Sequence, residues 1–167
     1  MARDDMNCTA IWYLGLLDTK RQAWLTAARA FEDGMGCYER TAGQTAELVK
    51  GFEARLDLDA GFRARRIAAL ETSVRELTSQ QYAAAFNAAN YYATGGNIPA
   101  ARRLIEIAAT DPALAEKVGK LREWLKDKTG RTRELPNPRN IRNFGTPRVT
   151  VSDKITLCLY SPISIRR

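Results

Sequence analysis

The sequence predicts an all-α protein, and three observations support this fold class. Alanine is very abundant among the 167 residues, and together with leucine, glutamate and arginine it gives a composition that favours helices. Apolar side chains recur at steps of three and four along the first 128 residues. The turn Gly95-Gly96-Asn97 and the pair Asp111-Pro112 separate the later periodic segments, as expected for residues that end and begin helices.

The first expected helix covers residues 9–19, and either Asp5 or Asn7 supplies its N-cap. A short polar turn at residues 20–22 comes next, and the following apolar residues at helical spacing begin with Trp24.

The second and third helices are expected to form a long antiparallel hairpin over about residues 23–94. Apolar residues repeat every seven positions in both, which predicts that each helix packs against a partner. In the second helix these residues are Tyr38, Ala42, Thr45, Val49, Phe52 and Leu56. In the third helix they are Ile67, Leu70, Val74 and Leu77. Asp59 is the expected N-cap after the turn, and arms of about 20 residues would project about 30 Å beyond the other helices.

The last two helices are predicted from the signals at their ends. Gly95 and Gly96 end the third helix, and Asn97 caps a fourth. Asp111 and Pro112 open a fifth helix as its cap and first residue. A single apolar stripe on this helix consists of Leu114, Val118, Leu121 and Leu125. Because its other sides are polar, the fifth helix fits the end of a stack of helices.

Two helix pairs share a pattern of small and aromatic side chains. The later pair carries Ala89, Tyr92, Gly96, Ala101, Ile105, Ala108 and Pro112. At the N-terminal end the corresponding places hold Leu14, Gly15, Trp24, Ala27, Phe31 and Gly34, with Gln22 in place of the turn glycine. This pattern resembles the tetratricopeptide repeat, in which small residues join two helices around a glycine-containing turn. The resemblance implies a protein-interaction scaffold without chemistry of its own, and a generic helical bundle is the alternative.

The composition argues against an enzyme. The chain has no histidine, so the usual general base and the commonest metal ligand are missing. Gly95-Gly96-Asn97 lies between helices, whereas phosphate-binding glycine loops come directly after a strand. Neighbouring carboxylates such as Glu32 and Asp33 are interpreted as solvated surface charge. We therefore expect no catalytic residue, cofactor or metal site.

The cysteines predict a cross-link. Two antiparallel helices joined near residues 21–22 place Cys8 and Cys37 at the same height, where a disulfide is geometrically plausible. Two buried free thiols are the alternative. With the disulfide, an oxidising compartment such as a periplasm is expected, with any leader sequence missing from this chain. Without it, the expected location is the cytoplasm. The chain has no apolar run of 18 residues, so no transmembrane span is expected.

The basic charge is concentrated at the C-terminal end. Residues 129–167 hold 8 lysines and arginines against 2 acidic residues, whereas residues 1–128 hold 18 against 17. This division predicts a helical domain at 1–128 and a basic, proline-containing tail that is disordered or forms a short β-hairpin. Five tail arginines are candidate contacts for nucleic acid or an acidic partner: Arg131, Arg133, Arg139, Arg142 and Arg148.

A smaller basic cluster lies near the expected hairpin turn, at Arg63, Arg65 and Arg66. Glu71 and Glu76 come soon after it in the chain, so local ion pairs are the predicted role of these arginines.

The function predicted from the sequence is protein–protein interaction, through the helix pairs or along the hairpin arms. The partner's identity is open, and a homodimer is a further possibility. Buried aromatic side chains often dominate interfaces, and the candidates here are Tyr13, Trp24, Tyr92 and Trp124. The alternative function is binding of nucleic acid or an acidic partner through the tail.

Overall fold

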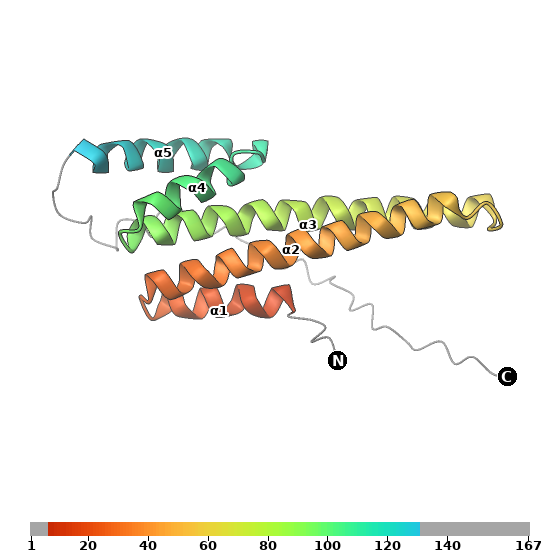
Figure 1. Cartoon of the computed structure of the whole chain (residues 1–167), viewed down its shortest axis with the longest axis horizontal. Helices are drawn as coiled ribbons and strands as arrows, with labels where there is room; N and C mark the ends of the chain where they lie inside the picture. Colours follow the sequence, from red (N-terminus) through yellow and green to blue (C-terminus); the bar gives the residue numbers. More distant parts are fainter. Residues whose placement is uncertain (1–6, 131–167) are drawn as a thin grey trace. The chain divides into compact units, whose positions relative to one another are not determined.

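The computed structural model describes residues 7–130 and contains five α-helices in that range (Figure 1). They are α1 (Cys8–Lys20), α2 (Trp24–Ala54), α3 (Ala60–Thr94), α4 (Ile98–Ala108) and α5 (Ala115–Gly130), and a short 3-10 helix, η1 (Pro112–Leu114), precedes α5. The all-α prediction is confirmed for this part of the chain, which contains no strand. The predicted basic tail, with its five candidate arginines and its possible β-hairpin, lies outside the described residues.

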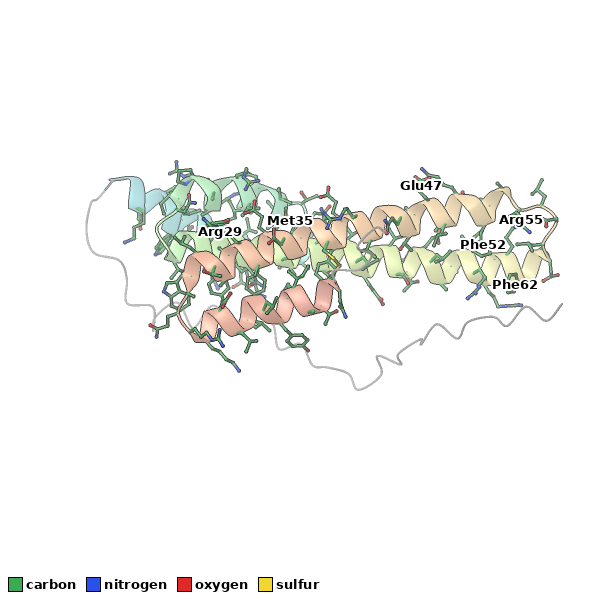
Figure 2. The ribbon with its side chains drawn as sticks, turned by 60° about the horizontal axis from the view of Figure 1, so that its bottom comes forward. Arg29, Met35, Glu47, Phe52, Arg55 and Phe62 are labelled. Carbon is green, nitrogen blue, oxygen red and sulfur yellow. A yellow bond between two sulfur atoms is a disulfide. The ribbon has the colours of Figure 1, made fainter. Side chains whose placement is uncertain are left out.

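Helices α2 and α3 form a long antiparallel hairpin, and they lie side by side in both figures (Figures 1 and 2). They contain 31 and 35 residues. The turn between them ends at Asp59, whose Oδ1 accepts the backbone N–H of Phe62 at 2.8 Å. As predicted, this carboxylate caps α3 because it satisfies a donor that has no partner within the helix.

Helix α1 packs against the first part of α2. Asn7 caps α1 by accepting the N–H of Thr9 at 3.0 Å. After α1, the chain reverses through Gln22, which has a left-handed φ of 61°. Cys8 and Cys37 form the predicted disulfide, with their Cα atoms 5.5 Å apart. The N-terminal end of α1 is therefore fixed covalently to the middle of α2.

One packing prediction for α1 is wrong. Leu14 was expected to pack between the two helices, but its side chain is 56% exposed. Ile11 and Gly15 are the residues of α1 that are buried. Gly15 lies so close to Phe31 that the missing side chain is what lets the two helices approach.

Helix α4 folds back on α3 after a turn at Gly96, which has a φ of +84°. Asn97 caps α4 by accepting the N–H of Ala100 at 3.3 Å. Small residues of the two helices, including Ala89 and Ala101, are fully buried in one shared core. Gly96 itself is exposed, so it serves the turn rather than the packing.

The last helix begins later than predicted. Asp111 accepts the N–H of Ala113 at 2.9 Å, but the residues it caps form η1, and α5 starts at Ala115. Pro112 is exposed and contributes its fixed backbone to this turn rather than to packing. The predicted apolar stripe of α5 is buried in the core, at Leu114, Val118, Leu121 and Leu125. Over the described part of the chain, no helix combines the length and the apolar character needed to cross a membrane.

Candidate functional site

The surface of most interest is the distal hairpin, which we define as residues 43–83. None of these residues is fully buried, whereas fully buried side chains are frequent on both sides of this range. The reason is visible in Figure 1, where α1, α4 and α5 lie beside the other end of the hairpin. Among the described helices, only α2 and α3 contribute to the distal hairpin.

An apolar stripe runs along the distal hairpin, where the two helices face each other. Its members keep the predicted seven-residue spacing and are half-buried: Thr45, Val49, Phe52, Ile67, Leu70, Val74 and Leu77. Two helices bury only part of such a stripe, because the sides that a third or fourth helix would cover remain in water. Next to the stripe, Leu48 is 56% exposed. The distal hairpin therefore exposes apolar surface against which another helix could pack.

The hairpin tip, which we define as residues 55–66, presents apolar side chains to solvent (Figure 2). Leu56 is 80% exposed and Phe62 is 41% exposed. The guanidinium carbon of Arg66 lies 5.7 Å from the centre of the Phe62 ring, within the range of a cation–π interaction. Arg55 instead forms a two-pronged ion pair with Asp57, at 2.7 and 2.8 Å.

The predicted ion pairs of the basic cluster at the tip are not formed. Within the described residues, Arg63, Arg65 and Arg66 make no ion pair with Glu71, Glu76 or any other carboxylate. Arg63 instead donates to the backbone carbonyl of Arg55 at 3.0 Å. Glu71 and Glu76 lie on the same helix but at least five positions further along, beyond the spacings that bring side chains together. Among residues 7–130, these three positive charges at the tip therefore have no carboxylate partner.

The outward side of α1 is a second exposed apolar surface. It consists of Tyr13, Leu14 and Leu17, which are 55%, 56% and 48% exposed. Tyr13 was a predicted contact residue, and its exposure is compatible with that role. Tyr13 and Leu17 lie on the side of α1 opposite the buried Ile11 and Gly15, and Leu14 lies between the two sides, so α1 is apolar on most of its circumference.

The other aromatic side chains that were predicted to contact a partner are buried or half-buried. Trp24 stacks on Tyr91 with ring centres 6.0 Å apart, and Tyr91 stacks on Phe31 at 5.5 Å. Tyr92 is buried, so the prediction that it is a surface contact is wrong. Trp124 is half-buried beneath Lys128, whose Nζ lies 5.4 Å from the ring centre.

A polar cluster links α2, α3 and α4. Glu32 accepts the hydroxyl of Tyr92 at 2.7 Å and also forms an ion pair with Arg103. Burial alone would raise the pKa of Glu32, but the hydrogen bonds from Tyr92 and Arg103 outweigh it and hold this pKa below its usual value. Burial and the same carboxylate raise the pKa of Tyr92 to about 12.

The interpretation of Glu32 as solvated surface charge is therefore wrong, because its side chain is only 26% exposed and two donors hold it. This cluster ties three helices together, because Glu32 of α2 contacts Tyr92 of α3 and Arg103 of α4. Within residues 7–130, no three acidic or cysteine side chains gather in a way that could bind a metal ion.

No family model, curated protein or solved structure matches the chain. The comparisons with known proteins therefore give no relative from which a role could be transferred.

Proposed function

We propose that this protein is a non-catalytic scaffold that binds another protein along the distal hairpin. The observation that carries the proposal is the half-buried apolar stripe of α2 and α3, which no other described helix covers. A partner helix that packs onto this stripe would bury the sides of Val49, Leu70 and Val74 that now face water. The exposed side chain of Leu48 would add to the same contact.

The tetratricopeptide-like character of the helix pairs is part of the proposal. It is supported by the small residues that join α3 to α4, since Ala89, Ala101 and Ala108 are all fully buried in one core. It is also supported by Gln22, whose left-handed backbone stands where the repeat has its turn glycine. Repeats of this kind present helices as surfaces for protein partners.

We propose further that the protein works in an oxidising compartment such as a periplasm. The disulfide between Cys8 and Cys37 supports this location, because structural disulfides persist where thiols are not kept reduced. Trapping free thiols before lysis would test it. A protein from a reducing compartment would react at Cys8 and Cys37.

Photo-crosslinking from two positions tests the binding surface. A photoreactive amino acid replaces Leu48 in one protein and the exposed Glu123 of α5 in the other. We expect position 48 to capture a protein that position 123 does not, because only the first lies beside the apolar stripe. Capture of a second copy of the chain from position 48 would identify a homodimer built on the same surface. Equal capture from both positions, or none from position 48, would contradict the proposal.

The alternative function is binding of nucleic acid or an acidic partner through the basic tail. Its support is the concentration of charge, with 8 basic against 2 acidic residues in positions 129–167. Deleting the tail separates the two functions. Under the alternative, the shortened protein loses affinity for RNA, DNA and acidic peptides, whereas crosslinking from position 48 persists under the main proposal.

A further inference from the structure

The hairpin tip combines exposed apolar side chains with positive charges that no carboxylate of the described residues pairs. Leu56, in the turn, is 80% exposed, which is the highest value among the large hydrophobic residues of the described chain. Phe62, in the first turns of α3, is 41% exposed. Residues 55–66 hold four arginines and two aspartates, which gives a formal charge of +2.

The two carboxylates of the tip are already occupied. Asp57 is paired with Arg55, and Asp59 accepts the backbone N–H of Phe62. The guanidinium groups of Arg63, Arg65 and Arg66 have no carboxylate partner within the described residues. The tip is therefore complementary in charge to an anionic surface. Its two aspartates do little to weaken the attraction, because both already have partners.

We propose that the hairpin tip docks on the surface of an anionic lipid bilayer. Leu56 and Phe62 enter the interface between headgroups and acyl chains, and Arg63, Arg65 and Arg66 contact lipid phosphates. Arginine suits this role because its planar guanidinium pairs with two phosphate oxygens at once. Binding at such an interface grows with the apolar area that is buried and with the attraction between basic side chains and anionic lipids.

The position of the apolar side chains favours a bilayer over other anionic partners. Leu56 belongs to the turn that ends the two-helix hairpin (Figure 1), and its 80% exposure leaves it free to enter a flat surface. A nucleic acid offers phosphates but no apolar layer for a leucine. An acidic protein would need an apolar hollow that matches this projecting end. This proposal is independent of partner binding along the stripe, which lies between the helices.

The first test measures binding of the full-length protein to vesicles of phosphatidylglycerol and phosphatidylcholine. The variant R65Q/R66Q should bind about 25-fold more weakly than the wild type, since each arginine at an anionic surface contributes roughly fivefold. The control R40Q/R75Q removes the same charge from exposed positions elsewhere on the hairpin. It should weaken binding by less than about threefold, because salt screens charges that do not touch the membrane.

The second test locates the tip and distinguishes it from the basic tail, which could itself attract anionic vesicles. Lipids brominated in their acyl chains quench a tryptophan that enters the bilayer interface. We expect added quenching for L56W, relative to the wild type, and none for the control L48W, which replaces another exposed leucine, on the arm of the hairpin.

Several results would overturn the proposal. One is that the protein does not bind anionic vesicles. Another is that it binds them without added quenching of L56W, so that another segment makes the contact. A third is that R65Q/R66Q keeps full affinity for vesicles but loses affinity for RNA or polyglutamate, which would identify the tip as a site for those polymers instead.

Discussion

Replacing Gly15 by alanine should destabilise the contact between α1 and α2, although alanine is the better helix former. A Cβ at this position would lie 2.9 Å from Cε2 and Cζ of Phe31. The ring cannot easily retreat, because Phe31 is 0% exposed and Tyr91 and Trp12 pack against it. Overpacking of this kind costs about 1–3 kcal/mol, whereas helix propensity returns about 1 kcal/mol. The net loss of unfolding free energy is therefore up to about 2 kcal/mol.

Gly34 provides the matched control, since it is also a buried glycine in the same contact. A Cβ there would meet only Cγ2 of Ile11, at an ordinary 3.6 Å, so G34A should gain up to about 1 kcal/mol from propensity. Urea unfolding followed by circular dichroism gives both values, and we expect G34A to exceed G15A by about 1–3 kcal/mol. Equal stabilities, or a G15A protein more stable than G34A, would refute the packing argument.

Three further predictions concern other contacts. C8S/C37S should lower the unfolding free energy by about 3–4 kcal/mol, because the disulfide closes a loop of about 30 residues, and a reductant should destabilise the wild type but not this variant. Q22G should raise the stability by about 1 kcal/mol in thermal unfolding, since glycine adopts a φ of 61° without strain, and no gain would contradict the assigned turn. E32Q should cost about 1–2 kcal/mol at pH 7. Because the folded-state pKa of Glu32 is lowered, its contribution is complete above the ordinary pKa of 4.5 and is lost as the pH falls through the folded-state pKa. The difference in stability between the variant and the wild type should therefore shrink as the pH is lowered below 4.5 in urea unfolding.

The helix boundaries were largely predictable because they depend on local chemistry. Asn7, Asp59 and Asn97 each accept a backbone N–H at the start of a helix, as their positions in the sequence indicate. Asp111 also caps, but the residues after it form a 3-10 turn before α5 begins. Because 3-10 turns are frequent at the ends of α-helices, a cap in the sequence fixes the start of the α-helix only to within a turn.

The sequence could not decide which side of α1 faces α2. Ile11 and Gly15 lie on one side of the helix and Tyr13 and Leu17 on the other, so apolar side chains occur on both sides. The choice is made by the close contact of Gly15 with Phe31, which is a tertiary effect. The only available signal was the glycine itself, since a glycine inside a helix often marks close packing.

The candidate surface was only partly predictable for the same reason. The seven-residue repeat predicted that α2 and α3 pack on a helix, but such a repeat does not tell how many helices share the stripe. It was also not predicted that Arg65 and Arg66 have no carboxylate partner within residues 7–130. Glu71 lies six and five positions after them, beyond the three- and four-residue spacings that bring side chains together on a helix.

Hydrogen exchange along the hairpin tests the central claim most directly. The full-length protein would be measured alone and with the protein captured from position 48. Binding along the stripe should slow the exchange of amides in residues 43–83, because a packed partner suppresses local opening of the two helices, and it should leave α4 and α5 unchanged. Unchanged exchange in residues 43–83, with protection confined to other helices or to the tail, would contradict the claim that the distal hairpin is the binding surface.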